Sequence, residues 1–114
     1  LACRAAAEGK PYVIPYSGPS DYVFVDDVAA AFVAAADSRP KGARVYNLTG
    51  ERAEAGDLVA AIEAASPGAR ISAAGPVLPV AADFAPSSVR EDFGGVPLTR
   101  LREGIARTVA HYRR

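Results

Sequence analysis

The chain has 114 residues, half of them apolar, and its 13 basic and 13 acidic residues give a net charge of zero. This length suits one small domain with a modest core. The charged residues are interspersed, which argues against nucleic acid or an anionic membrane as a partner, because phosphate groups are neutralised by clustered positive charge. Cys3 is the single cysteine, which excludes an intrachain disulfide and a cysteine-based metal cluster.

No stretch is typical of a signal peptide or of the roughly 20 apolar residues that span a membrane. We therefore expect a cytoplasmic location and no membrane partner. The chain begins at Leu1 and contains no methionine. We expect upstream residues to precede it in the natural protein, so that residues 1–114 form a single lobe of a longer chain.

The first elements are short and are separated by glycine and proline. Residues 1–7 predict the end of a helix, which Gly9 terminates because glycine readily adopts the left-handed conformation. Residues 12–14 predict a strand between two prolines. Residues 17–20 have the composition of a turn, and the β-branched and aromatic residues 22–25 predict a second strand.

An alanine-rich helix is predicted over residues 28–36, with Val28 and Phe32 on its inward face. Asp26 or Asp27 is expected to be its N-cap, where a carboxylate accepts hydrogen bonds from free backbone N–H groups. The two adjacent carboxylates also suggest acid–base chemistry. Capping is favoured because neighbouring side chains point in different directions.

Residues 44–48 predict a third strand, and residues 55–65 predict a helix with Leu58 and Ile62 turned inward. A short strand is predicted over residues 70–72. Residues 73–86 are rich in proline and glycine and predict a loop. These elements indicate an α/β fold in which a small sheet of short strands is packed by three or four helices, including the two that follow.

The last part of the chain predicts two helices. Ser87 is expected to cap a short helix that runs through Phe93, and Thr99 is expected to cap the final helix. Apolar residues recur about every four positions in this final helix, at Leu101, Ile105, Val109 and Tyr112.

Four short motifs occur in an order that resembles a known protein family. They are Gly9–Tyr12, Tyr22–Ala29, Val45–Glu51 and Leu101–Ile105. Together they resemble the C-terminal substrate-binding lobe of the extended short-chain dehydrogenases/reductases, the NAD-dependent epimerases and dehydratases. The resemblance implies a Rossmann-type oxidoreductase whose chemistry is hydride transfer, as in epimerisation, dehydration or carbonyl reduction, with NAD or NADP as its cofactor.

The residues that carry this chemistry in the family are absent from the sequence. No glycine-rich turn with the spacing of a dinucleotide-binding site occurs. The family's catalytic pair is a tyrosine with a lysine four residues later, whereas Lys10 and Lys41 are preceded at that spacing by Ala6 and Asp37. We therefore expect no catalytic residue, no cofactor-binding residue and no metal site in this chain. The nucleotide-binding half is expected to be supplied by a missing N-terminal domain.

The resemblance also bears on the substrate. Family members that act on nucleotide sugars hold the diphosphate with arginines. By the resemblance, Ser20 and residues Ala73–Pro76 stand at the corresponding positions of this chain. Neither serine nor alanine replaces the charge of a guanidinium group. We expect a smaller or uncharged substrate, such as a free sugar acid, a ketone or an aldehyde.

Four candidate substrate-binding residues surround the turn that the resemblance places at the cleft: Tyr16, Ser17, Ser20 and Tyr22. Their hydroxyl groups could bind a polyol. Alternatively, the serines are ordinary turn residues and the tyrosines belong to the core.

Two further candidates, Asn47 and Phe84, come from other parts of the chain. Asn47 is expected at the carboxyl end of a strand, where ligands gather in α/β sheets, although a structural hydrogen bond is the alternative. Phe84 lies in the proline-rich loop with Val80, and these side chains could line an apolar pocket or simply cover the core. His111 has no neighbouring ligand set and is expected at the surface.

The expected partners are the nucleotide-binding domain and a small-molecule substrate. An apolar face left exposed by the absent domain would also favour homo-oligomers. The competing hypothesis is a free-standing, non-catalytic binding or interaction module derived from the same lobe.

Overall fold

The computed structural model describes residues 1–39, 41–85 and 87–114. It confirms the predicted α/β class, but the described residues form five helices rather than three or four. Pro40, and Pro86 at the end of the predicted loop, lie outside the described residues. In chain order the elements are α1 (Ala2–Ala7), β1 (Tyr12–Ile14), β2 (Pro19–Tyr22), α2 (Val25–Asp37), β3 (Glu51–Glu54), α3 (Ala55–Ala65), β4 (Ile71–Ala73), α4 (Val89–Asp92) and α5 (Leu101–Tyr112).

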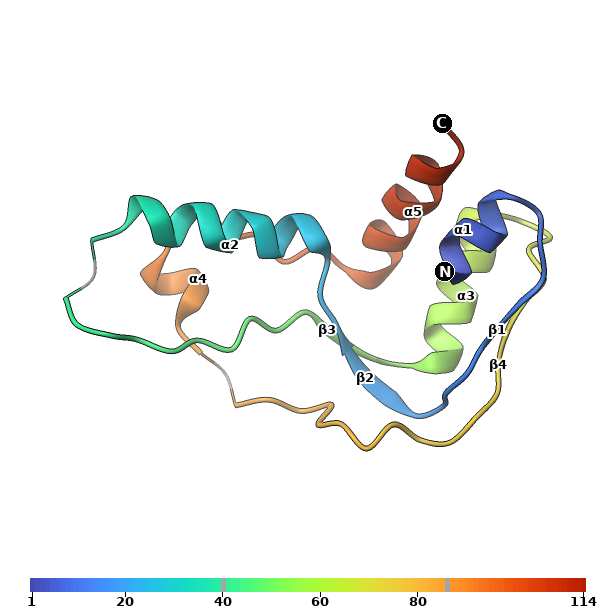
Figure 1. Cartoon of the computed structure of the whole chain (residues 1–114), viewed down its shortest axis with the longest axis horizontal. Helices are drawn as coiled ribbons and strands as arrows, with labels where there is room; N and C mark the ends of the chain where they lie inside the picture. The colour runs from blue at the N-terminus through green and yellow to red at the C-terminus, as the bar shows by residue number, and fades with distance from the viewer. Residues whose placement is uncertain (40, 86) are drawn as a thin grey trace.

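The strands form two small sheets in place of the single sheet that was predicted. β1 and β4 are parallel, with Tyr12 opposite Ile71, whereas β2 and β3 are antiparallel, with Tyr22 opposite Glu51. A single bridge between Ser17 and Val77 extends the contact beyond the first pair. The chain between β1 and β2 therefore passes from one sheet to the other (Figure 1).

The main core lies where α1, α3 and α5 come together beside β1 (Figure 1). Its buried residues are Ala6, Ile14, Leu58 and Ile62, and Leu101 and Ile105 of α5 pack against them. Apolar residues of α3 and α5 recur at helical spacing, so each helix presents one face to this core. The sequence predicted α1, β1 and α3 with these bounds to within a residue.

A second, smaller core lies at the other end of the molecule. Val89, Phe93 and Val96 are buried there, and Ala31 and Ala34 of α2 pack against them with Tyr46 and Leu48. The two cores lie at opposite ends of a flat particle of 50 × 33 × 16 Å (Figure 1). Its radius of gyration is 16.0 Å, larger than the roughly 13 Å of a compact domain of similar length.

The strand predicted over residues 44–48 is wrong. No strand forms there, although Tyr46 and Leu48 turn toward the second core while Val45 and Asn47 are exposed. This alternation is that of a strand, but no neighbouring strand pairs with the segment within the described part of the chain. The second predicted strand also shifts, because β2 covers Pro19–Tyr22 and Val25 already begins α2.

The predicted caps of α2 and α5 are wrong as well. The N-cap of α2 is Phe24, and Asp27 is buried within the first turn of the helix. The Asp27 carboxylate accepts hydrogen bonds from Thr99, which was expected to cap α5. α5 begins instead after Arg100, and Glu51 Oε2 accepts from the backbone N–H of Leu101 at 2.9 Å. A remote side chain, that of Glu51, therefore serves the start of α5.

Two smaller expectations also differ from the structure. Phe32 is 74% exposed because α2 turns Ala31 and Ala34, not Phe32, toward the second core. Ser87 does not cap α4, whose N-cap is Ser88, and its hydroxyl donates to the backbone carbonyl of Asn47. Among the helices formed by the described residues, none combines the length and hydrophobicity needed to cross a bilayer.

Candidate functional site

Three of the six predicted substrate-binding residues line one cavity, which we call the Asn47 cavity. It has a volume of about 430 Å³ and lies between β2, the extended segment before β3 and the loop after β4. Ser20, Asn47 and Phe84 line it, together with Asp21 and Val80. A hydroxyl, an amide and a carboxylate thus face the same space as two apolar side chains. This combination suits a small molecule with hydroxyl or carbonyl groups.

The backbone around the Asn47 cavity is held by side chains from other elements. Both carboxylate oxygens of Asp21 accept from the backbone N–H of Gly50, at 3.1 and 3.0 Å. Ser87 Oγ donates to the backbone carbonyl of Asn47 at 2.7 Å, and Arg90 donates to that of Thr49 at 2.8 Å. The bond to Ser87 uses only the Asn47 backbone, so it leaves the side-chain amide available to a ligand.

Gly50 lies in close contact with β2. A Cβ atom at this position would stand 1.8 Å from the carbonyl oxygen of Tyr22. Only glycine therefore allows the segment before β3 to approach β2 and bring Asn47 and Ser20 to the same cavity.

The other three predicted site residues lie elsewhere. Tyr16 and Tyr22 pack against the main core, with their hydroxyl oxygens 3.4 Å apart. Burial, followed by the hydrogen bond with Tyr16, raises the pKa of Tyr22 well above its usual range. Ser17 Oγ donates to the carbonyl oxygen of Gly75 at 2.8 Å. The structure places these side chains in packing and turn contacts, outside the Asn47 cavity.

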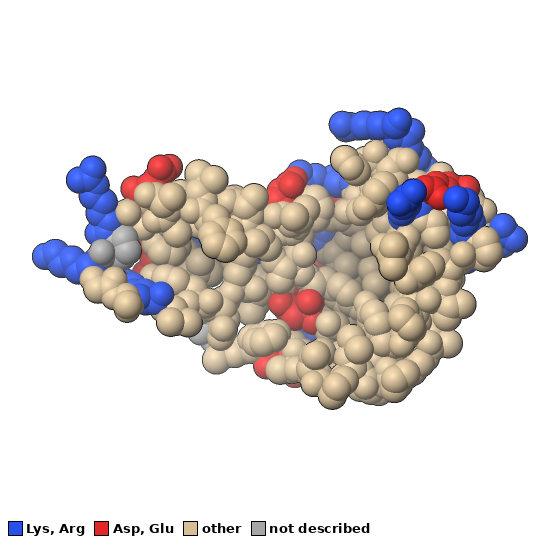
Figure 2. All heavy atoms as spheres, viewed as in Figure 1, with Lys and Arg blue, Asp and Glu red and all other residues tan. Residues whose placement is uncertain are grey.

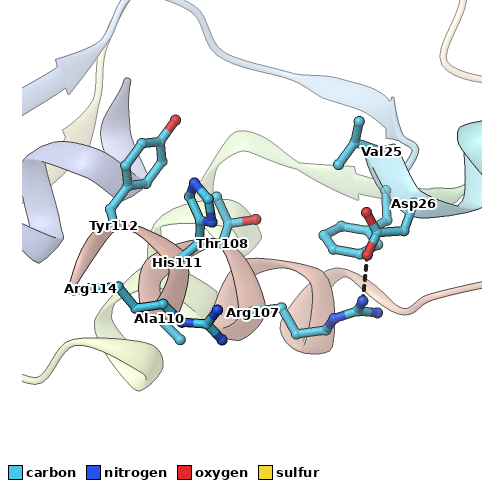
Figure 3. Close-up of a pocket in the computed structure, with 9 residues that line it drawn as sticks. Val25, Asp26, Arg107, Thr108, Ala110, His111, Tyr112 and Arg114 are labelled. Atoms are coloured by element: carbon cyan, nitrogen blue, oxygen red, sulfur yellow. Dashed lines mark hydrogen bonds and ion pairs between the residues drawn. The ribbon is translucent and has the colours of Figure 1, made fainter.

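A larger groove of about 530 Å³ lies between the start of α2 and the end of α5. In Figure 3 the guanidinium group of Arg107 points to the carboxylate of Asp26 across the groove. The same guanidinium carbon stands 4.4 Å from the centre of the Phe24 ring. Asp26 and Arg107 thus pair with each other and fasten α5 to α2, and Arg114 also lines the groove. His111 lines the groove on the same helix as Arg107 (Figure 3).

The residues present do not fit the pyrophosphate of a dinucleotide cofactor. Such a site needs a glycine-rich turn and free N–H groups at a helix start. Asp26 and Asp27 occupy the first turn of α2, which follows β2 after only Val23 and Phe24. At the start of α3 Glu54 and Asp57 form a capping box, in which the Asp57 carboxylate accepts from the backbone N–H of Glu54 at 2.9 Å. Carboxylates at both strand-to-helix junctions would repel a phosphate.

Metal binding has no candidate site in the described ranges. Within residues 1–39, 41–85 and 87–114, no group of three or more His, Cys, Asp or Glu side chains is arranged to hold a metal ion. Cys3 is a lone thiol, and burial raises its pKa.

Sequence reasoning missed Asp21 and Tyr46 as residues that line the Asn47 cavity. Asp21 stands between two residues that were named as candidates, so its position in the chain was a usable signal. Tyr46 was assigned to a strand, and no local pattern indicates that its hydroxyl donates to Asp92 at 2.8 Å.

No protein-family model matches the chain, and no curated protein sequence does. Solved structures do match its fold. A partial-consensus L-threonine 3-dehydrogenase matches with a TM-score of 0.76 and 20% identity, over 98% of this chain and 39% of that one. The UDP-glucuronic acid 4-epimerase of Bacillus cereus, in complex with UDP-glucuronic acid and NAD, also matches with a TM-score of 0.76 and 20% identity, over 98% and 38%.

A third match is TunA, an NAD-dependent NDP-hexosamine 5,6-dehydratase involved in tunicamycin biosynthesis. Its TM-score is 0.68 at 21% identity, over 99% of this chain and 38% of that one. The chain therefore spans less than two fifths of the length of each of these enzymes. For the fold, the resemblance predicted from the sequence is confirmed.

Proposed function

We propose that this chain is the substrate-binding part of an NAD- or NADP-dependent epimerase, dehydratase or reductase, and that it is catalytically incomplete by itself. The observation that carries this proposal is the likeness of fold, over 98% of the chain, to an L-threonine 3-dehydrogenase and a UDP-glucuronic acid 4-epimerase. The lack of a glycine-rich cofactor motif and of a tyrosine–lysine pair in the sequence supports the second half of the proposal.

In this proposal residues 1–114 form one lobe of a longer enzyme. The matched 98% of this chain amounts to 39% of the dehydrogenase structure, which corresponds to a chain of about 290 residues, the size of two ordinary domains. The remaining part would be an N-terminal nucleotide-binding domain that holds NAD or NADP. The whole enzyme would be located in the cytoplasm. The role of this chain is to bind the substrate and orient it toward that domain.

The Asn47 cavity is the proposed substrate site. Ser20, Asp21 and Asn47 offer hydrogen-bond donors and acceptors to hydroxyl or carbonyl groups, and Phe84 offers an apolar surface to a carbon skeleton. No lysine or arginine is among the described residues that line the cavity. A diphosphate, and equally the carboxylate of a sugar acid, would lack a cationic partner there, so we assign an uncharged sugar-like or small carbonyl compound as the substrate.

Ligand titration of the 114-residue chain tests this site. Glucose and UDP-glucose are each added to 15N-labelled protein, and the backbone amide signals are followed by NMR. We expect glucose to shift the signals of Ser20, Asn47 and Phe84 saturably, and the UDP group to add no affinity. Ser20→Ala should weaken binding, whereas Ser72→Ala, at an exposed serine of β4, should leave it unchanged.

Other outcomes would refute defined parts of the proposal. Much tighter binding of UDP-glucose would overturn the substrate class, and shifts outside the Asn47 cavity would overturn the site. The intact mass of the protein in its native source tests the fragment hypothesis. A native species of 114 residues would contradict it and favour the free-standing, non-catalytic binding module.

A further inference from the structure

The loop after β4 forms one wall of the Asn47 cavity. Val80, Ala81 and Phe84 line the cavity from this side, and we call residues 78–85 the strap. Val80 and Phe84 are 54% and 47% exposed, so the surrounding chain covers only about half of each residue. A ligand in the cavity would cover more of this apolar surface, which favours a strap that closes over it.

The chain is anchored on either side of the strap. Before it, the backbone N–H of Ser17 donates to the carbonyl of Pro76 at 3.0 Å, and Ser17 Oγ donates to that of Gly75 at 2.8 Å. After it, Ser87 Oγ donates to the carbonyl of Asn47 at 2.7 Å. A movement of the strap is therefore limited by a fixed point before it and another after it.

The strap itself has one polar contact with the sheet beside it. Among the described residues, no backbone hydrogen bond joins residues 78–85 to another segment. Asp83 is the single charged residue of the loop 73–85, and the lower edge of the molecule, where Figure 1 places this loop, is mostly uncharged in Figure 2. Asp83 Oδ1 lies 3.1 Å from Nε of Arg52 on β3. This ion pair joins the strap to the sheet that carries Ser20.

The ion pair is of a kind that breaks easily. The side chains of Asp83 and Arg52 are 84% and 49% exposed, and exposed pairs are weak and are screened by salt. A weak contact suits a movable element, because a strong one would keep the cavity shut. Asp83 precedes Phe84 in the chain, so release of Asp83 also frees the neighbouring wall of the cavity.

We propose that residues 78–85 form a strap that opens to admit the substrate to the Asn47 cavity, and that the Arg52–Asp83 ion pair holds this strap closed. This inference rests on the proposed function. The ion pair regulates access and not affinity, because it forms with or without a ligand and so slows entry and exit alike. Ionic strength would then set the rate at which the substrate exchanges.

Exchange kinetics of the 15N-labelled 114-residue chain test the strap. Glucose is titrated, and NMR line shapes give its association and dissociation rate constants together with Kd. In Asp83→Asn we expect both rate constants to rise about twofold to fivefold, the effect of losing an exposed ion pair, and Kd to stay the same. Added salt should speed exchange in the unmodified chain but not in Asp83→Asn, because glucose carries no charge on which salt could act.

Two further variants sharpen this experiment. Asp26→Asn removes another exposed ion pair, the one with Arg107 between α2 and α5, and should leave the rate constants unchanged. The reversed pair, Arg52→Asp with Asp83→Arg, should restore slow exchange. A reversed pair that exchanges as fast as Asp83→Asn would overturn the proposal. So would a higher Kd in Asp83→Asn with an unchanged association rate, because Asp83 would then be only a part of the cavity wall.

Strap motion in the free chain gives a readout that needs no ligand. Relaxation dispersion of the backbone amides of Val80, Ala81 and Phe84 should report opening that is about twofold to fivefold faster in Asp83→Asn. The amide of Val77, beside the first anchor, should not change. Unchanged opening together with saturable glucose binding would overturn the strap alone. Faster opening in a chain that binds no glucose would support the role of the ion pair and overturn the proposed substrate site.

Discussion

The carboxylate of Asp27 accepts two hydrogen bonds from Thr99, one from the backbone N–H at 2.7 Å and one from Oγ1 at 2.6 Å. Asp27 is 1% exposed and lies in the first turn of α2, and Thr99 lies just before α5. These two bonds join the helix of the second core to the segment that leads into a helix of the main core. They connect the two ends of the flat molecule through one buried side chain.

Loss of this contact should destabilise the fold. Asp27→Ala would leave the buried N–H and hydroxyl of Thr99 without an acceptor, so we expect the free energy of unfolding to fall by about 1–3 kcal/mol. Urea unfolding followed by circular dichroism measures the change. Asp26→Ala is the matched control, since it removes only an exposed ion pair with Arg107, worth about 1 kcal/mol or less. Equal losses in the two variants would contradict the structural role of Asp27.

Gly50 should tolerate no side chain. In Gly50→Ala the new Cβ would stand 1.8 Å from the Tyr22 carbonyl oxygen, which forces the backbone apart and should cost about 1–3 kcal/mol. Gly56→Ala in α3 is the control, because no atom lies within 4 Å of the position that its new Cβ would take and alanine favours a helix by about 0.5–1 kcal/mol. The midpoint temperature of thermal unfolding should therefore fall for Gly50→Ala and rise for Gly56→Ala. A harmless Gly50→Ala would contradict the close contact.

Glu8 should make the stability depend on acidic pH. Hydrogen bonds from Lys10 and Arg4 lower the pKa of Glu8 to about 2. A carboxyl group whose pKa is lower in the folded state stabilises the fold fully at pH values above its ordinary pKa, near 4.5. This contribution is lost as the pH falls toward 2. The 13C chemical shift of the Glu8 carboxyl, followed during an acid titration, should give the low midpoint.

The control for Glu8 removes the partner that contributes most. Lys10→Ala eliminates the 2.7 Å contact with Glu8 Oε2, so the midpoint should rise toward the ordinary range. An unchanged midpoint in this variant would show that Lys10 does not hold the carboxylate in solution.

The uncovered face of α2 should make the isolated chain self-associate. At high concentration, and without its proposed partner domain, we expect Phe32 and Val33 to promote oligomers. In analytical ultracentrifugation, Phe32→Ser should lower the weight-average sedimentation coefficient, whereas Tyr112→Ser on α5 should not. A strictly monomeric chain, or an equal response of both variants, would count against this face as the association surface.

The sequence predicted the elements that depend on local signals. Helical spacing of Leu58 and Ile62 located α3, and Gly9, with a φ of 68°, ended α1 as expected. The expectations failed where a distant residue decides the outcome. Aspartate is a common N-cap residue, and Asp27 lies where a cap is expected. Its carboxylate instead accepts hydrogen bonds from Thr99, 72 positions away, and no local pattern reveals this contact.

The candidate site was predicted in part for the same reason. Ser20, Asn47 and Phe84 come from three separate segments, and the structure brings them to one cavity. Tyr16 and Tyr22 satisfy the pattern of a polar turn equally well, yet they pack, partly buried, against the main core. Residues 44–48 have the composition of a strand but lack a neighbouring strand in the described chain, and hydrogen-bonded pairing cannot be judged from one segment.

The contact between the first and last helices fixes the order in which the molecule can fold. α1 packs against α5 (Figure 1), and Arg113 donates to Ser66, whose hydroxyl in turn donates to the carbonyl of Ala6. During synthesis the main core therefore cannot pack completely until α5 has left the ribosome. Until then Ile14 and Ile62 are incompletely covered. Such distant contacts slow folding and lengthen the exposure of apolar surface, so a chaperone would have its longest opportunity to bind before α5 is made.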